Sequence, residues 1–328
     1  MLKYIIKRIL YMIPTLIAIS LLSFFIIQLP PGDYLSYRIA GMEEQGQTID
    51  VGTLEALKAR YGLDQPLIVQ YWKWISAIVL HGDFGESFEW NRPVSMMIWG
   101  RMGMTIVLSI ITTIFIWIVA FPLGIYSAVK KYSIGDYIFT FFGFIGLAIP
   151  NFLFALTLMY IAFSKFGLSV GGLFSPRFQE APWSWAKFAD LLQHIWIPTI
   201  VLGLSGTASL IRTMRANLMD ELKKPYVETA RAKGLKESRL LVKYPVRVAL
   251  NPFISTVGWI LPTLVSGSTV VSIVLNLPTT GPLLLRSLQS QDMYLAGSFI
   301  LLMSTLTVIG TLLSDILLAV ADPRIRFS

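Results

Sequence analysis

The sequence has no cysteine and few charged residues, and each shortage excludes a class of protein. Without cysteine, the chain of 328 residues forms no disulfide, uses no thiolate nucleophile and holds no zinc through thiolates. Lys, Arg, Asp and Glu make up only 14% of the residues, whereas soluble domains have about 25%. Hydrophobic residues make up 55%, and the mean hydropathy is +0.65. This is the composition of an integral membrane protein.

Catalytic signatures are also missing. The chain has two histidines, His81 and His194, and neither an H-E-x-x-H pair nor a G-x-x-x-x-G-K-[ST] phosphate loop occurs. Gly203-Leu204-Ser205-Gly206 matches the G-x-S-G pattern of rhomboid proteases, but both histidines precede Ser205 and lie outside the predicted spans. Close helix packing is therefore the predicted use of these residues. We expect no enzyme activity, cofactor or metal in this chain, so any ATP would be hydrolysed by a partner.

Six apolar stretches are long enough to cross a bilayer, which takes about 20 residues. They are Ile9 to Leu29, Thr105 to Val129, Tyr137 to Phe163, Ile195 to Ile211, Pro252 to Leu275 and Leu295 to Val320. The fourth is the weakest because Pro198, Gly203 and Gly206 interrupt it, a break that is tolerated where a helix lines a cavity or packs on neighbours. The predicted fold class is all-α, with six transmembrane helices.

The first apolar run is predicted to remain as a membrane span. It is too long for a signal peptide and leads to two prolines, Pro30 and Pro31, instead of a small-residue cleavage site. The hydrophilic stretch that follows contains two helical patterns, with Thr53 and Asp64 as predicted N-caps. The second pattern has an apolar stripe of Ile68, Tyr71, Trp72, Ile75 and Val79. This helix lies either at the membrane interface or on the body of the protein.

The distribution of Lys and Arg predicts the orientation. If the N-terminus is cytoplasmic, that side holds 17 of these residues and the other side 10. Six of the ten lie in the stretch 31–101, which is long and therefore counts weakly in the positive-inside rule, so the informative contrast is 17 against 4. Both termini and the loop 212–250 are predicted to be cytoplasmic. The net charge of +8 then reflects membrane topology and not nucleic-acid binding.

Two regions follow from this topology. Residues 1–101 are predicted to form the first span and an extracytoplasmic helical insertion, and residues 102–328 to form a five-helix core. Another predicted extracytoplasmic loop, from Gly167 to His194, carries Trp183 and Trp185. These rings either anchor the loop at the membrane interface or meet a solute or a docking protein.

The charged segment between the fourth and fifth spans is the main candidate site. Pro225 favours the first turn of a helix and Gly234 favours the left-handed position that ends one, which predicts a helix from Pro225 to Lys233. A second helical stretch is predicted from Lys236. Small side chains alternate with charged ones on the first helix, namely Thr229, Ala230 and Ala232 with Glu228, Arg231 and Lys233. Such a surface suits docking into a groove of another protein, although a solvated loop helix has a similar composition.

Glu228-Thr229-Ala230 followed by Gly234 resembles the EAA-x-x-x-G loop of permease subunits of ABC importers. Over its whole length the chain resembles the oligopeptide and dipeptide branch of that family, through Tyr61 to Leu67, Gln70 to Trp72, His81 to Gly85, Arg92 to Val94 and Asp322 to Arg326. The resemblance implies that this loop forms a coupling helix in a cleft of a cytoplasmic ATPase subunit. The residues it assigns to that contact are Tyr226, Glu228, Thr229, Ala230, Ala232 and Gly234.

The same resemblance implies the partners. They are a second, related permease in a heterodimer, two cytoplasmic ATPase subunits that hold ATP and magnesium, and an extracytoplasmic solute-binding protein. The expected location is the inner membrane of a bacterium or archaeon, with the chain embedded in lipid.

The solute is predicted to be hydrophilic, either an oligopeptide or dipeptide or a short oligosaccharide. The branch usually has Glu where Ser272 stands and an aromatic run where residues 275–279 stand, and loss of the acidic residue leaves a neutral, hydroxyl-bearing lining consistent with sugar. The charged loop 212–250 also departs from the family: Thr229 replaces an alanine of the motif, and the I-x-L-P tail is absent. Substrate-path candidates are Asn151, Ser205, Ser268 and Ser272.

The alternative function is a secondary transporter or channel that works without an ATPase. It predicts intramembrane charged pairs or inverted repeats, and no repeat is evident. Asp315 is the only charged residue within the predicted spans. A charge at mid-membrane costs about 2.5 to 3.5 kcal/mol on the insertion scale. Asp315 is either a proton or solute site or, as its position near the cytoplasmic end favours, a structural group that reaches interfacial water.

Overall fold

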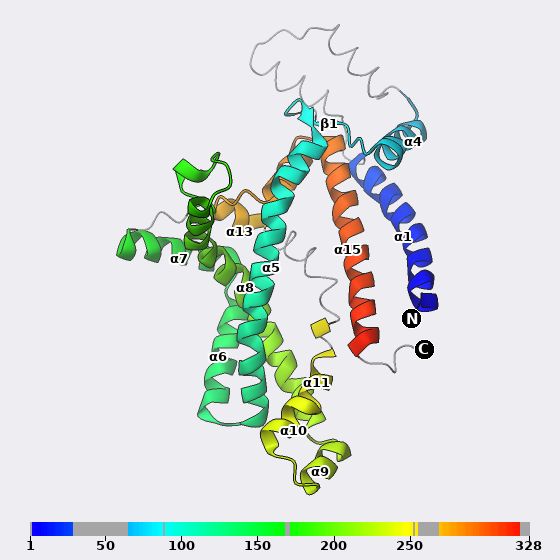
Figure 1. The fold of residues 1–328 in the computed structure, drawn as a ribbon. Coiled ribbons are helices and arrows are strands. Elements are labelled where there is room, and N and C mark those ends of the chain that lie inside the picture. Colours follow the sequence, from blue (N-terminus) through cyan, green and yellow to red (C-terminus); the bar gives the residue numbers. More distant parts are fainter. Residues whose placement is uncertain are drawn as a thin grey trace. The chain divides into compact units, whose positions relative to one another are not determined.

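The computed structural model describes residues 2–28, 65–87, 89–167, 171–251, 253–254 and 269–321. Helices dominate these residues, and one short hairpin pairs β1 with β2 antiparallel, Glu86 opposite Pro93 and Ser87 opposite Arg92 (Figure 1). The elements in chain order are α1 (Leu2–Gln28), α4 (Leu67–Ser76), a π-helical turn (Ala77–His81), β1 (Glu86–Ser87), β2 (Arg92–Pro93), α5 (Val94–Val129), α6 (Ile134–Ala148), α7 (Asn151–Phe166), a 3-10 turn (Pro176–Phe178), α8 (Trp185–Glu221), α9 (Pro225–Ala232), α10 (Glu237–Lys243), α11 (Pro245–Ala249), α13 (Thr269–Val274), α14 (Thr280–Gln289) and α15 (Met293–Ala321).

Four of the described helices are long and apolar enough to cross a membrane. They are α1, α5, α8 and α15, and they correspond to the first, second, fourth and sixth predicted spans. The bent pair α6 and α7 would make a fifth crossing if it is one span. The predicted fifth span, Pro252 to Leu275, lies mostly outside the described residues. The fold is therefore an all-α membrane fold, and the count of six spans stays a prediction.

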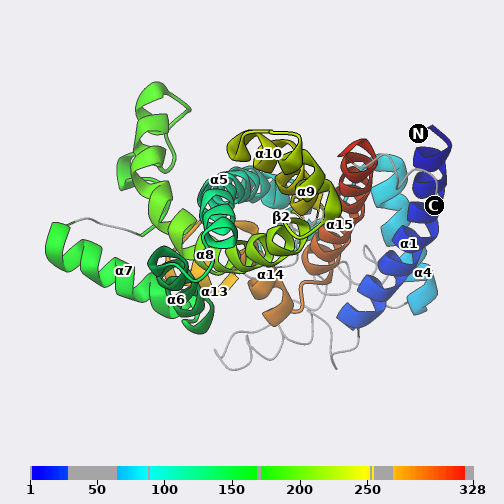
Figure 2. The same cartoon turned by 90° about the horizontal axis from the view of Figure 1, so that it is seen from below.

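The third predicted span is not a straight helix. α6 ends at Ala148, α7 begins at Asn151, and their axes differ by 103°. Both views show α7 turning away from α6 (Figures 1 and 2). Ile149 is extended, with φ −83° and ψ 124°, because the ring of Pro150 disfavours a helical conformation in the residue before it. The predicted span from Tyr137 to Phe163 is therefore divided into two helices at Pro150.

α8 is longer than predicted and continuous. It begins where Ser184 Oγ accepts a hydrogen bond from Lys187 N at 3.2 Å, and it runs through Pro198 to Glu221. The predicted interruption of the fourth span is therefore absent. Ten residues at each end, beyond the predicted Ile195 to Ile211, are also helical, so the predicted loop 167–194 ends at residue 184.

The glycines of α8 allow close packing against α5. A methyl group on Gly203 would lie 2.9 Å from Phe115 Cδ1, and one on Gly206 would lie 2.8 Å from Ile116 Cδ1. Further along the same two helices, a methyl group on Gly124 of α5 would lie 2.7 Å from Met214 Cβ of α8. These contacts confirm the prediction that the Gly203–Gly206 motif serves helix packing.

The described chain forms two compact units. Unit 1 contains residues 104–278 and 309–328, and unit 2 contains residues 2–103 and 279–308. The long helices α5 and α15 each continue from one unit into the other.

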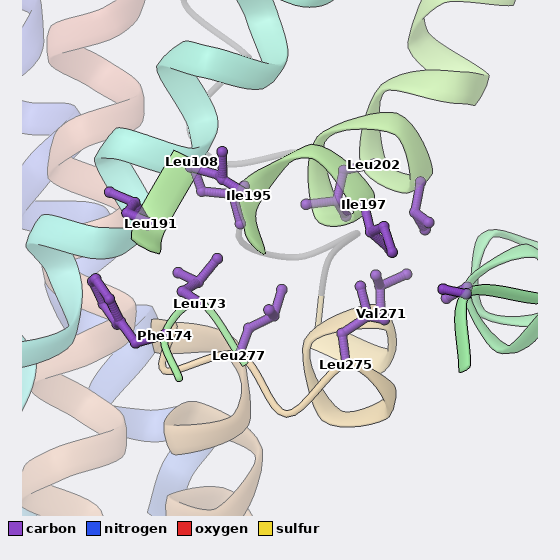
Figure 3. Close-up of a cluster of buried hydrophobic side chains, with 13 residues drawn as sticks. Leu108, Leu173, Phe174, Leu191, Ile195, Ile197, Leu202, Val271, Leu275 and Leu277 are labelled. Atoms are coloured by element: carbon purple, nitrogen blue, oxygen red, sulfur yellow. The ribbon is translucent and has the colours of Figure 1, made fainter. Parts of the chain in front are cut away.

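One apolar core cluster of unit 1 joins α5, α7, α8, the loop before α8 and the segment around α13 (Figure 3). Leu191 and Ile195 of α8 pack with Leu173 of the preceding loop and with Leu275, which follows α13. Gly172 N also donates a hydrogen bond to Leu275 O at 2.7 Å. Asp190 of α8 holds the same loop, since its carboxylate accepts hydrogen bonds from Ser175 N, at 2.8 Å, and from Ser175 Oγ. The described part of the loop is therefore fixed to α8.

In unit 2, α4 packs on α1 and α15 through a cluster of Phe24, Tyr71, Trp74 and Leu301. Tyr71 and Trp74 are 6% and 4% exposed, whereas Ile68 and Trp72 are 65% and 63% exposed. The predicted stripe was therefore partly wrong, because Tyr71 OH bonds Ser20 Oγ at 2.8 Å and turns that face inward. The N-cap residue is Pro66 and not Asp64. The helix predicted after Thr53 lies outside the described residues.

Candidate functional site

The candidate site is the helical segment that follows α8. α9 begins at Pro225 and ends at Ala232, and Gly234 has φ +77°. Gly234 N donates to Arg231 O at 2.9 Å, and Leu235 N donates to Ala230 O at 3.3 Å. A left-handed glycine that closes the last turn is the usual helix ending. The predicted helix is confirmed to within one residue, as is the second stretch, which appears as α10.

A two-point ion pair joins α9 to α10. Arg231 Nη2 lies 2.6 Å from Glu237 Oε1, and Arg231 Nε lies 3.1 Å from Glu237 Oε2. The hydrogen bond from Arg231 lowers the pKa of the Glu237 carboxyl below its usual value. The stability that this ion pair contributes is present above the usual pKa of a glutamate carboxyl. It is lost as the pH falls through the lowered pKa of Glu237. At neutral pH the pair therefore stays charged and bridges the turn at Gly234.

The helix pair is held by apolar packing that reaches α8 through α11. Val227 of α9 and Leu240 of α10 are fully buried, and α10 contacts both α9 and α11. Behind them, Val246 and Ala249 of α11 form a cluster with residues of α8 and of the end of α5, namely Met214, Leu218 and Ala128. Figure 1 shows α9, α10 and α11 gathered at one end of α8, and Figure 2 shows α9 and α10 from below. The segment is therefore a packed structure and not a loose loop.

Most of the predicted coupling residues lie on the open surface of this segment. Ala230 is half-buried, and the exposed ones are Tyr226, Glu228, Thr229, Ala232 and Gly234. Thr229 Oγ1 donates to Pro225 O at 2.9 Å, so this hydroxyl is satisfied within the helix. No heavy atom would lie within 4 Å of a side chain added at Gly234. The surface presented by α9 is small, open and rigidly supported.

Tyr226 also connects α9 to α8. Its hydroxyl donates a hydrogen bond to Glu221 Oε2, the last residue of α8, at 2.5 Å, and its ring centroid lies 6.5 Å from that of Tyr244. Partial burial and the Glu221 carboxylate raise the pKa of Tyr226 above its usual value, so the hydroxyl keeps its proton. This bond could not be predicted from the sequence, because it depends on how the chain turns between the two helices.

A second ion pair ties α8 to α6. Arg215 Nε and Nη2 each donate to one oxygen of Asp136 at 2.9 Å, and Asp136 is 2% exposed. The same carboxylate accepts from Tyr132 N at 2.9 Å, which fixes the turn between α5 and α6. We name this contact the Asp136–Arg215 clamp. The pair lies just outside the predicted spans, because α6 and α8 both extend beyond the predicted limits as helices.

The structure brings together two of the four substrate-path candidates. Asn151, the first residue of α7, donates from Nδ2 to Ser205 Oγ of α8 at 3.5 Å, directly at the break after α6. Ser272 is fully buried in α13, and Ser268 lies outside the described residues. Asp315 is half-buried in α15. The roles of these residues in a solute path stay predictions.

Trp183 and Trp185 remain open to the surroundings, at 63% and 87% exposure. The rings of Trp183 and Phe174 lie 5.4 and 4.9 Å from Lys187 Nζ, which donates to Ala181 O at 2.6 Å. The loop before α8 thus has a fixed base and an exposed aromatic edge, which fits either of the two predicted uses. Among the described residues, no group of three or more metal-binding side chains occurs.

The fold and the site define a class: a multi-pass α-helical membrane protein in which a packed helical segment follows one of the spans. Comparison with known sequences identifies the family. Residues 120–327 match the inner-membrane component of binding-protein-dependent transport systems, and residues 1–109 match the N-terminal part of that membrane component. The chain belongs to this family, and it is a permease subunit of an ABC importer.

Three relatives illustrate its place in the family. The oligopeptide transport system permease protein AppB of Bacillus subtilis (strain 168) is 37% identical over 329 residues, which is 100% of both chains. A putative peptide permease protein of Brucella ovis is 33% identical over 334 residues, with 99% of each chain covered. The glutathione transport system permease protein GsiC of Salmonella paratyphi A is 35% identical over 329 residues, again 100% of both.

Membership of this family has three consequences for the chain. It is a multi-pass protein of the inner membrane and not an enzyme in itself. It works with ATPase and binding-protein components. It lies in the peptide branch, as its resemblance to the oligopeptide permeases predicted.

Proposed function

We propose that this chain carries peptides across the inner membrane in an ATP-driven importer and that α9 is its contact with a cytoplasmic ATPase subunit. The observation that carries the proposal is the rigid support of an open surface. α9 exposes Tyr226, Glu228 and Thr229, while Val227 on its other face is fully buried and the Tyr226 hydroxyl bonds Glu221 of α8. A helix with this combination can dock in a groove and pass on a push without deforming.

In this proposal, the transporter contains a second, related permease and two ATPase subunits, and both termini of this chain are cytoplasmic. The charge contrast of 17 against 4 supports that orientation. It places α9 on the side where ATP is available. Peptide is favoured over oligosaccharide because the three relatives named above are described as peptide, oligopeptide and glutathione permeases.

The contacts of unit 1 indicate how movement would travel. Closure of the ATPases displaces α9, and the Arg231–Glu237 pair keeps α9 and α10 moving together. The Tyr226–Glu221 bond and the packing of α11 pass the displacement to α8. The Asp136–Arg215 clamp then passes it to α6, and the break at Pro150 lets α7 respond separately. Rocking of helices between two arrangements opens the solute path alternately to each side.

Replacing Gly234 with valine tests the contact of α9. A β-branched residue cannot readily adopt φ +77°, so the end of α9 would be forced into another conformation. We expect ATP-driven peptide uptake by the reconstituted transporter to fall at least tenfold while ATP hydrolysis continues. Radiolabelled peptide uptake and phosphate release are measured on the same proteoliposomes.

Gly167→Val is the matched control. Gly167 also ends a helix, has φ +62° and has no heavy atom within 4 Å of a side chain added there, but it lies on the predicted opposite side of the membrane. Its uptake is expected to stay near that of the wild type. Normal uptake by Gly234→Val, or an equal loss in both variants, would contradict the assigned contact. ATP-independent uptake driven by an ion gradient would instead support a secondary transporter.

A further inference from the structure

A second feature, separate from the coupling segment, is an open pocket of about 640 Å³ within unit 2. Its walls come from the β1–β2 hairpin, the start of α5 and α14. The volume falls in the range that holds small organic ligands, about 300 to 1,000 Å³. Three of its lining residues are arginines, Arg92, Arg101 and Arg286, and none is acidic. We name it the arginine pocket.

The walls of the arginine pocket are held in place by hydrogen bonds. Asp292, which is fully buried, accepts from Ser87 Oγ and, at 3.3 Å, from Glu89 N. The other oxygen of Asp292 accepts from Leu295 N at 3.2 Å in the first turn of α15. Trp90 N in turn donates to Ser87 Oγ at 3.2 Å. The hairpin is thus fixed to the base of α15, so the pocket is formed before any ligand enters.

Arg286 is oriented by two further contacts. Its Nε lies 2.8 Å from Glu89 Oε1, and its guanidinium lies 5.3 Å from the centre of the Trp90 ring. Glu89 is outside the pocket lining and offsets one of the three positive charges. Arg92 forms no ion pair with any residue that the structure describes. The positive charge of Arg92 is therefore left for an anion to neutralise.

The chemistry of the lining indicates the ligand. Arginine forks bind carboxylates through two parallel hydrogen bonds. Beside the arginines lie Trp90, Met96 and Met97, which offer apolar and adaptable surface. A ligand that fits both parts has a carboxylate next to an apolar group. The C-terminal end of a short peptide has this pattern.

We propose that the arginine pocket binds the terminal carboxylate of a peptide on the extracytoplasmic side, before translocation. The pocket residues of α5 precede the predicted second span, and α14 lies between the predicted fifth and sixth spans, so both are on that side by the charge count. The inference rests on the proposed function, because it supplies an entry site for the same solute. It adds a specificity: a free carboxylate is required.

The test compares trileucine with trileucine amide, which differ only in the terminal carboxylate. Binding of each is measured on the whole transporter in lipid nanodiscs, without the solute-binding protein. We expect the free acid to bind at least tenfold more tightly. Arg92→Gln should weaken binding of the acid about tenfold, equivalent to about 1.4 kcal/mol, and leave binding of the amide unchanged. Arg92→Lys keeps the positive charge but lacks the guanidinium fork. Its affinity for the acid should therefore lie between those of the wild type and Arg92→Gln.

Arg177→Gln is the matched control, because Arg177 is exposed on the same predicted side but outside the pocket. It should not change the preference for the acid. Equal binding of acid and amide, or an equal effect of Arg177→Gln, would overturn the pocket. A third outcome would also overturn the proposal: Arg92→Gln no longer attaches the solute-binding protein but still prefers the acid. The pocket would then serve the docking of that protein.

These outcomes separate the two proposals. Equal binding of acid and amide by a transporter that takes up peptide with ATP contradicts only the arginine pocket. A preference for the acid in a transporter that shows no ATP-driven peptide uptake supports the pocket and contradicts the proposed function.

Discussion

At the scale of single residues, the glycines of α8 show how a small side chain determines a packing distance. Gly203 and Gly206 face Phe115 and Ile116 of α5, and even one added carbon would come within 2.9 and 2.8 Å of them. In a bilayer, where apolar burial does not drive helices together, such close contact is a main source of association. The two glycines therefore stabilise the fold because they have no side chain, which lets α5 and α8 approach closely.

Gly203→Leu is expected to destabilise the chain by overpacking, at a cost of about 1 to 3 kcal/mol. The check is the midpoint of thermal unfolding of the purified transporter, followed by tryptophan fluorescence. Gly143→Leu in α6 is the control, since no heavy atom would lie within 4 Å of a side chain there. An unchanged midpoint for Gly203→Leu would show that α5 and α8 can separate freely at this point.

At the scale of elements, the Asp136–Arg215 clamp is the contact between helices whose loss is expected to affect transport most. Asp136→Asn removes the charge that Arg215 needs, and hydrogen bonds to charged groups are worth about 1.5 to 3 kcal/mol. We expect peptide uptake to fall severalfold with ATP hydrolysis retained, because α8 would move without α6. Uptake and hydrolysis are compared in the same vesicles.

Asp220→Asn makes the same change in an exposed pair of α8, where Asp220 Oδ1 lies 3.9 Å from Lys223 Nζ. Exposed pairs contribute little, so this variant should behave as the wild type. Asp136→Glu keeps the charge and should recover part of the uptake. If the asparagine variant transports normally, the clamp plays no part in transmission.

The elements also show what sequence could predict. α9 was predictable because Pro225 and Gly234 act through their own backbone preferences. The size of the bend after α6 was not predictable, although Pro150 marks its place, because hydropathy does not give the angle between two helices. The buried face of α4 was partly misassigned, since the Tyr71 hydroxyl depends on Ser20 of another helix. Asp136 and Arg215 are 79 residues apart, and no local pattern joins them.

At the scale of the whole molecule, the family and its membrane class followed from composition, span pattern and the loop motif together. The arginine pocket did not, because Arg92 and Arg286 come from distant segments. Orientation is the property of the whole chain that remains to be measured. The lack of cysteine makes that measurement direct, since one introduced thiol has no background.

Ser238→Cys in α10 and Glu180→Cys before α8 are both at exposed positions. A membrane-impermeant maleimide added to intact cells, with the outer barrier opened, should label Cys introduced at 180 and not at 238. Inverted membrane vesicles should give the reverse pattern. Labelling of position 238 from outside would contradict the cytoplasmic placement of α9.

The clamp also bears on how the protein is made. Arg215 follows Asp136 by 79 residues in the chain, so α6 is synthesised and reaches the membrane before the partner of Asp136 does. A carboxylate without its partner is costly in the bilayer, so the start of α6 stays at the interface until α8 arrives. The order of synthesis thereby becomes an order of assembly, in which the arrival of α8 fixes the start of α6.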